Sequence, residues 1–210
     1  EGELPPRARL VELALGMPSL IRVAKEEADY DHAGDQHAHG GYDPHLWLDP
    51  TYGIRYVEKI QETLVSLDPA GRDSYTQNAA RYIAQIRQAD ANVQRCLAGV
   101  PQARRKLVSQ HGSLAYFNRY YKLQSVGSIA DFAGQERGPA SLARLAQVMK
   151  KEGVRVIFVE PQFSQGQARA LAEATGARIV RIYSDAFDKT VNSYLKLLQA
   201  NGQALCTAFK

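Results

Sequence analysis

The chain has 210 residues, of which 45% are hydrophobic and 23% are charged. These values are typical of a folded globular protein, and they allow one large domain or two lobes with separate cores. No apolar run of about 18 residues occurs, so no transmembrane helix is expected. The net charge is +4, but the basic residues are spread thinly and are not interleaved with aromatic residues. A nucleic-acid partner is therefore not expected.

The first fifty residues are mixed in character. Residues 8–16 have the apolar spacing of a helix that ends at Gly16, and residues 20–25 form a short apolar run that could be a strand. Residues 26–41 are polar, without periodicity, and predict a mobile surface loop.

Two helices are predicted next. Apolar residues recur at spacings of three and four over residues 51–67, and Asp68-Pro69 ends that pattern. A second helix is predicted over residues 70–97. Its length of about 40 Å is long enough to run along two lobes.

From about residue 105 the chain alternates between strand and helix patterns. Such alternation predicts an α/β fold with a doubly wound, four-stranded parallel sheet. Ser141 is a plausible N-cap of one of its helices. The predicted strands are 106–110, 123–129, 154–159 and 178–183, and the predicted helices are 114–121, 141–152, 165–175 and 188–209.

Residues 31–50, DHAGDQHAHGGYDPHLWLDP, hold four of the five histidines: His32, His37, His39 and His45. Imidazole is a common ligand of zinc and similar metals. The first three histidines lie in the polar loop, where they could form a secondary metal site. His45 lies between two Asp-Pro pairs and beside the only tryptophan, which predicts a structured corner that presents one imidazole.

Parallel sheets bind ligands outside the carboxyl ends of their strands. His111 and Asp185 follow the first and fourth predicted strands, so we expect them at one edge of the sheet, facing His45 from the preceding lobe. Together they predict a metal site that lacks a fourth ligand, which could be water, a second carboxylate oxygen or a loop histidine. Alternatives stay open for each residue. His111 could be a hydrogen-bonded cap, Asp185 could belong to a helix N-cap, and His45 could be a loop histidine between two prolines. Glu160 could be a catalytic base or position a loop.

The two cysteines, Cys96 and Cys206, belong to no CxxC or Cys/His cluster and are poor metal candidates. If they pair, the bridge closes a loop of about 110 residues, which stabilises by roughly 4–5 kcal/mol in the chain-entropy model, and it indicates an oxidising compartment. Two separate buried thiols are the equal alternative.

Four segments resemble the solute-binding proteins of zinc and manganese ABC importers. They are GGYDPHLWLDP (40–50), LVSQHGSLAYF (107–117), VRVIFVEPQFS (154–164) and IYSDAF (182–187). The resemblance implies two α/β lobes joined by a long rigid helix. It divides the chain into the remainder of an N-terminal lobe with the His-rich loop 31–41 (1–69), the linking helix (70–100) and a C-terminal lobe (101–210).

The resemblance also implies a function. It predicts a monomeric, extracytoplasmic protein without catalytic activity, which holds a metal ion between its lobes with His45, His111 and Asp185 and passes it to a membrane permease. Histidine at position 111 and the His-rich loop favour Zn²⁺ over Mn²⁺. The alternatives are a manganese-binding member of the family, a zinc-dependent hydrolase with Glu160 as base, and a metallochaperone or adhesin-like protein without a transporter.

One departure from the family concerns the start of the chain. Family members have a longer N-terminal lobe with another histidine ligand, whereas this sequence begins EGELPPRARL, without a signal-peptide core. The expectation from the sequence is either a fragment or processed form, in which the site should be incomplete, or a truncated lobe.

Overall fold

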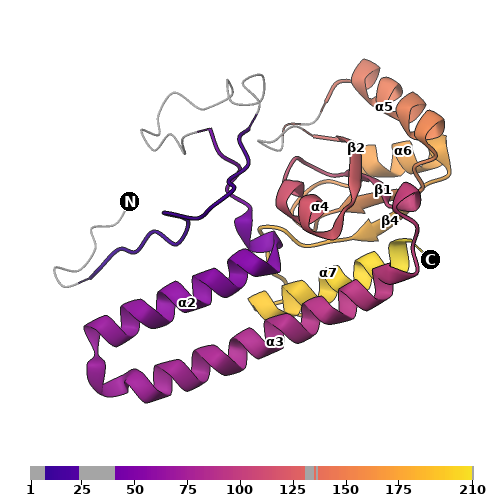
Figure 1. Ribbon diagram of the computed structural model, residues 1–210. Coiled ribbons are helices and arrows are strands. Elements are labelled where there is room, and N and C mark those ends of the chain that lie inside the picture. Colours follow the sequence, from indigo (N-terminus) through magenta and orange to yellow (C-terminus); the bar gives the residue numbers. More distant parts are fainter. Residues whose placement is uncertain (1–7, 24–40, 131–134, 136, 210) are drawn as a thin grey trace.

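The computed structural model describes residues 8–23, 41–130, 135 and 137–209 (Figure 1). It is an α/β fold in which a four-stranded parallel sheet is covered by helices, and a long helical hairpin extends from one side. The predicted fold class is confirmed. Among the described residues, no helix combines the length and apolar character needed to cross a bilayer.

The strands of the sheet lie in the order β2-β1-β3-β4, and every neighbouring pair is parallel. All four predicted strands are present, each shorter than its apolar run. A helix follows each strand, because parallel strands need a crossover connection. The bounds are β1 Lys106–Ser109, α4 Ala115–Tyr121, β2 Gln124–Ser128, α5 Pro139–Glu152, β3 Val156–Val159, α6 Gly166–Thr175, β4 Arg178–Arg181 and α7 Tyr194–Ala208.

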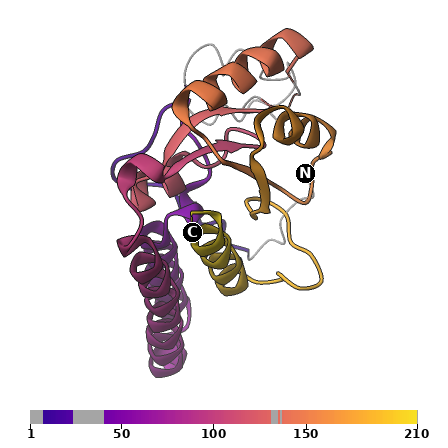
Figure 2. The same ribbon diagram turned by 90° about the vertical axis from the view of Figure 1, so that its right-hand side faces the viewer.

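The sheet separates two apolar cores. On one face, Leu107 and Phe158 belong to a core shared with α4, α7 and the long helix α3, Arg72–Ala98. On the other face, Val108 and Ile157 pack with residues of α5 and α6. Successive residues of a strand point to opposite faces, so these continuous apolar runs bury the sheet on both sides. Figure 2 shows α5 and α6 on the side of the sheet away from α3 and α7.

The helical hairpin consists of α2, Pro50–Leu67, and α3, joined by the 3-10 turn Pro69–Gly71 where the sequence predicts a break. The 27 residues of α3 span about 40 Å. Near its C-terminal end α3 packs against α7, where Cys96 and Cys206 form a disulfide with 5.6 Å between their Cα atoms. Of the two alternatives for the cysteines, the structure has the pair.

Residues 8–23 differ from the prediction. In place of a helix over 8–16 the chain is irregular, and Leu10 and Leu15 are 82% and 68% exposed. A short helix is marginal in water unless its apolar face is buried, and here these two leucines find no such cover. The predicted strand over 20–25 is reduced to one antiparallel bridge between Arg22 and Tyr42, with residues 24 and 25 outside the described ranges.

The starts of α5 and α7 differ from the prediction for local reasons. Helix α5 begins at Pro139 after Gly138, not at Ser141, because the fixed φ of proline suits the first helical position. Helix α7 begins at Tyr194, after Ser193, whose hydroxyl accepts a hydrogen bond from the Lys196 backbone N–H as an N-cap. Upstream, the Asp188 carboxylate accepts hydrogen bonds from the backbone N–H groups of Thr190 and Val191 and holds residues 188–191 in a turn.

Candidate metal centre

The segment between the two Asp-Pro pairs is a fixed corner. Asp43 Oδ1 accepts a hydrogen bond from the backbone N–H of His45 at 2.8 Å and another from its ring Nδ1 at 2.7 Å. One carboxylate oxygen therefore fixes both the turn and the imidazole. Both residues are buried, and Nε2 of His45 faces Asp185, whose Oδ1 lies 3.4 Å away.

The second Asp-Pro pair starts α2. The Asp49 carboxylate accepts hydrogen bonds from the Thr51 backbone N–H at 2.8 Å and hydroxyl at 2.6 Å. Pro50 occupies the first helical position, where its missing N–H is not needed. The 3-10 turn Leu46–Leu48, with both leucines buried, lies between the corner and the helix. The corner is thus anchored to the long hairpin.

Trp47 connects this corner to the segment that carries Asp185. Its indole N–H donates to the Ser184 carbonyl at 3.0 Å, and its own carbonyl accepts from the Tyr194 hydroxyl at 2.8 Å. A side chain at Gly53 would collide with Tyr194, so glycine at that position of α2 lets the tyrosine approach. Two regions far apart in sequence are thereby held in register.

His111 follows β1 and Glu160 follows β3, and these strands are neighbours in the sheet. His111 Nδ1 donates to Glu160 Oε1 at 2.7 Å. Glu160 is fully buried, and its other oxygen accepts from Gln162 Nε2 at 3.1 Å and contacts the Ser184 hydroxyl. A buried carboxylate needs such partners. Glu160 therefore positions His111 and does not face water as a general base.

Asp185 follows β4 and completes the cluster. Its Oδ2 lies 3.6 Å from His111 Nε2, and its Oδ1 lies 3.4 Å from His45 Nε2. The ligand atoms of these three residues all lie within 4.8 Å of one another. Ligands at about 2.0–2.1 Å from a tetrahedral zinc are roughly 3.4 Å apart. The two distances to Asp185 match this value, whereas the set as a whole spreads up to 4.8 Å. The Asp185 side chain is 39% exposed, which leaves the cluster open to solvent on its side.

Two carboxylates control the protonation of His45. Burial alone would lower the pKa of His45, but hydrogen bonds and charges from Asp185 and Asp43 raise it from 6.5 to about 9. Burial would raise the pKa of Asp185, yet the hydrogen bond and charge of His45 lower it below its usual value. In the absence of a cation, a proton on His45 compensates the neighbouring acids.

The structure brings together all three residues that the sequence proposes as metal ligands. The histidines of the polar loop, His32, His37 and His39, lie outside the described residues. The role of Asp43 was not predicted. The signal was present, because an Asp side chain often accepts a hydrogen bond from the backbone two residues later, here that of His45, in an Asx turn. The pairing of Glu160 with His111 depends on β1 and β3 being neighbours, which the sequence does not display.

The family model described as zinc-uptake complex component A, periplasmic (ZnuA), matches residues 3–208. The chain belongs to this family. The resemblance inferred from the motifs is confirmed. ZnuA-family proteins are solute-binding transport components and not enzymes, which agrees with the expected lack of catalytic activity and argues against the hydrolase alternative.

Relatives of this ZnuA-family chain bear the names of different metals. The zinc-binding lipoprotein AdcA of Streptococcus pneumoniae is 29% identical over 86% of this chain and 36% of its own length. The manganese-binding lipoprotein MntA of Halalkalibacterium halodurans is 27% identical over 80% of this chain and 53% of its own length. The chain thus spans between about a third and a half of these relatives.

Solved structures confirm the fold. A mutant, manganese-bound periplasmic metal-binding protein from Candidatus Liberibacter asiaticus superposes with a TM-score of 0.81 at 23% identity. The match covers 99% of this chain and 74% of that one. The sheet and the long helix are therefore arranged as in that structure.

Proposed function

We propose that this chain is the metal-binding part of an extracytoplasmic solute-binding protein that captures Zn²⁺ and delivers it to the permease of an ABC importer. The observation that carries the proposal is the convergence of His45, His111 and Asp185, with donor atoms within 4.8 Å of one another. Family membership supports a role in transport, and the Cys96–Cys206 disulfide fits an oxidising compartment.

The proposed site lies between two lobes. We assign residues 1–69 to an N-terminal lobe, residues 70–100 to a linking helix and residues 101–210 to a C-terminal lobe. His45 precedes α2, whereas His111 and Asp185 follow strands of the sheet. An ion held by all three would therefore bridge the lobes, so that its binding and release are linked to their relative position.

Capture of the ion follows from the hydrogen bonds behind the ligands. Asp43 and Glu160 accept from Nδ1 of His45 and His111, so each ring turns its Nε2 towards Asp185. A carboxylate behind a ligating imidazole fixes its orientation and raises its basicity. Asp185 is the accessible member of the set and is the first group an incoming cation meets. The ion then replaces the proton on His45.

Zinc is the cargo that the donor set supports best. Two imidazoles and one carboxylate suit a borderline cation such as Zn²⁺, whereas Mn²⁺ prefers sites richer in oxygen. The manganese-binding name of MntA makes Mn²⁺ the second candidate, to be titrated beside zinc. A preference for manganese would keep the transport role and change its cargo.

The test is metal analysis with calorimetry in a background that lacks the loop histidines, H32A/H37A/H39A, so that stoichiometry reports the cluster alone. One zinc should bind, and His45→Ala, His111→Ala and Asp185→Ala should each weaken it at least tenfold, or about 1.4 kcal/mol. Asp73→Ala, in the first turn of α3, is the control and should bind like the background. Unchanged affinity in all three cluster variants would falsify the proposed site.

A second proposal concerns His32, His37 and His39 and rests on the sequence alone. These residues would act as a low-affinity collector that raises the local zinc concentration near the site. Deleting residues 31–39 should then reduce uptake at limiting zinc and leave uptake at saturating zinc unchanged. If the deletion variant and the intact chain took up zinc equally at both concentrations, the collector role would be refuted.

A further inference from the structure

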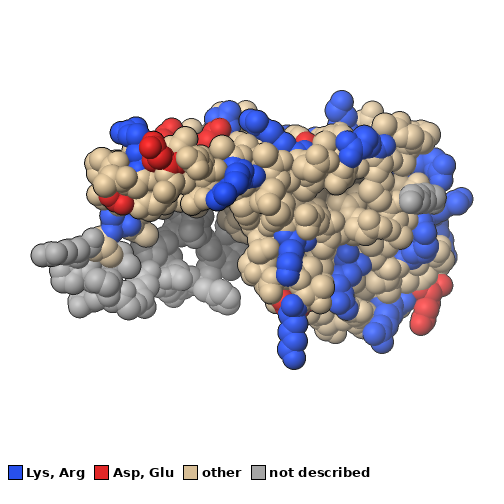
Figure 3. Space-filling model, turned by 90° about the horizontal axis from the view of Figure 1, so that it is seen from below, with Lys and Arg blue, Asp and Glu red and all other residues tan. Residues whose placement is uncertain are grey.

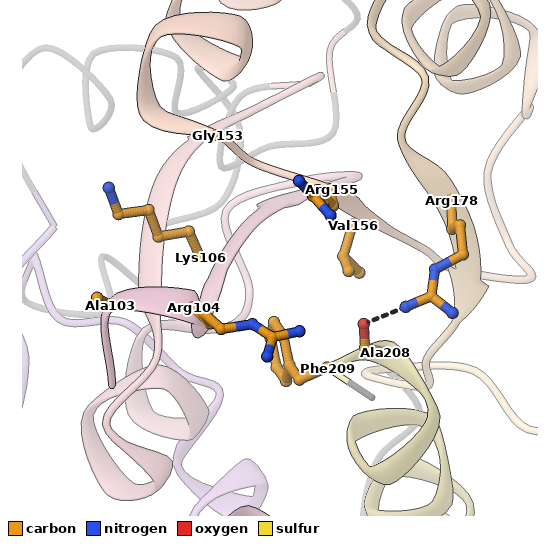
Figure 4. A pocket seen from close by; sticks show the side chains of 9 residues that line it. All are labelled: Ala103, Arg104, Lys106, Gly153, Arg155, Val156, Arg178, Ala208 and Phe209. Atoms are coloured by element: carbon orange, nitrogen blue, oxygen red, sulfur yellow. Dashed lines mark hydrogen bonds between the residues drawn. The ribbon is translucent and has the colours of Figure 1, made fainter. Parts of the chain in front are cut away.

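The opposite edge of the sheet, where the strands begin, has a cavity of its own. It measures about 670 Å³ and is lined by residues at the starts of β1, β3 and β4 and at the ends of α5 and α7 (Figure 4). Small-molecule sites commonly measure about 300–1,000 Å³. The cavity is separate from the proposed metal centre, because the amino and carboxyl ends of parallel strands lie at opposite edges.

The side chains around this cavity are strongly basic. Of the nine described residues that line it, four are cationic, namely Arg104, Lys106, Arg155 and Arg178, and none is acidic. Figure 3 shows the same tendency on a larger scale, with Lys and Arg gathered at the end of the molecule away from the hairpin tip and few Asp and Glu among them. The net charge of +4 for the whole chain does not by itself explain why Lys and Arg gather at this end.

Part of this charge has a structural explanation. Helix C-termini carry partial negative charge and attract cations, and α5 and α7 both end here. Arg178 Nη2 donates to the Ala208 carbonyl at 2.7 Å. Lys106 Nζ donates to the Glu152 carbonyl at 3.2 Å and to its carboxylate at 2.8 Å. These two cations are engaged by the fold itself.

The other two cations, Arg104 and Arg155, donate no hydrogen bond to the described ends of these helices. Within the described part of the chain, the side chains of Arg104 and Arg155 make no hydrogen bond or ion pair. In Figure 4 they enter from different sides of the cavity, and Arg178 enters from a third. The buried side chains of Val156 and Phe209 add an apolar wall. Uncompensated guanidinium groups beside an apolar wall are suited to an organic anion.

We propose that this cavity binds a phosphate-bearing molecule through Arg104 and Arg155, with Arg178 as a third contact. Guanidinium groups recognise carboxylate and phosphate through paired N–H donors. A carboxylate offers two oxygens in one plane, whereas a phosphate offers oxygens in several directions. Arginines that approach from three sides therefore favour phosphate. The ligand carries its phosphate as a free molecule or as a lipid headgroup.

The experiment uses the full chain in a buffer without divalent cations, because pyrophosphate itself binds them. Inorganic pyrophosphate is titrated by calorimetry, and vesicles of phosphatidylcholine with and without phosphatidylglycerol are tested by co-sedimentation. The variant R104Q/R155Q removes the two uncompensated charges and leaves the helix contacts of Lys106 and Arg178 in place. The control R72Q/R87Q removes the same charge from exposed positions of α3.

Binding that R104Q/R155Q weakens at least tenfold and R72Q/R87Q leaves within twofold supports the proposal. If pyrophosphate binding is weakened in this way, the ligand is a free phosphorylated molecule. If only binding to phosphatidylglycerol vesicles is weakened, the ligand is a lipid headgroup. The proposal is overturned if neither probe binds, or if both double variants lose binding equally. Matching circular dichroism spectra and melting temperatures show that the variants are folded.

Discussion

The two edges of the parallel sheet carry side chains of opposite character. His111, Glu160 and Asp185 gather where the strands end, and Lys106, Arg155 and Arg178 gather where they begin. In an α/β sheet helix N-termini point to the first edge and helix C-termini to the second, so the fold itself favours anions at one and cations at the other. Charge at an edge of the sheet is therefore partly a property of the fold. A ligand site is indicated by charged groups beyond those that the helix ends require.

The largest expected effect concerns the disulfide, which ties α3 to α7 close to the basic edge. The variant C96S/C206S should lower the free energy of unfolding by about 2–5 kcal/mol, because the unfolded chain loses a long-range constraint. Urea unfolding followed by circular dichroism measures it. Zinc affinity of the folded protein should stay within threefold. A larger loss would mean that the carboxyl edge depends on the bridge as well.

The next prediction compares the effects on zinc affinity of two glutamates at opposite edges of the sheet. Glu160→Gln keeps the shape of a fully buried side chain and removes the charge behind His111, so zinc affinity should fall about 10- to 100-fold. Glu152→Gln, which removes the carboxylate partner of Lys106 at the basic edge, is the matched control and should leave zinc affinity unchanged. Equal affinities in the two variants would contradict the positioning role of Glu160.

The pH dependence of zinc binding tests the charge balance of the carboxyl edge. The pKa of His45 is raised to about 9, so below that pH the ion must displace a proton, and affinity should fall about tenfold for each unit of acidification. The pKa of Asp185 is lowered, so its carboxylate stays ionised and adds no proton near neutral pH. Calorimetry between pH 6.5 and 8.5, in buffers of different ionisation enthalpy, should show about one proton released. Affinity independent of pH would refute this linkage.

The smallest effect concerns the link between the corner and the sheet. Trp47→Phe removes the hydrogen bond to the Ser184 carbonyl and should cost about 1 kcal/mol of stability, together with a severalfold loss of zinc affinity. Tyr75→Phe removes the hydroxyl that contacts Asp68 near the hairpin tip and serves as the control, with zinc affinity unchanged. An equal response of affinity in the two variants would show that the link does not position the ligands.

The sequence predicts the sheet well because its signals are local. Apolar runs mark the strands, and Gly153 and Gly176 end two helices in left-handed conformations that suit glycine. The N-terminal helix fails as a prediction because Leu10 and Leu15 have the right spacing but are largely exposed. Amphipathic spacing identifies the apolar face that a helix would have to bury. It does not show whether the fold provides a surface that covers this face.

The candidate site divides in the same way. His111 and Asp185 could be placed at one edge from the order of strands and helices, since both follow strands. Glu160 could not be paired with His111 from the sequence, because that contact depends on strand order in space. His45 could be proposed as the third ligand from its histidine-rich segment, but its contact with Asp185 could not be derived, because no local rule brings a loop before α2 against the end of β4.

The position of Trp47 has one more consequence. It is the only tryptophan in the chain, and its ring centroid lies 5.5 Å from that of His45. Its emission therefore comes from a single place, beside the imidazole that we propose exchanges a proton for a metal ion. We expect that exchange to alter the electric field around the indole, so that cargo loading becomes visible as intrinsic fluorescence, without any attached dye.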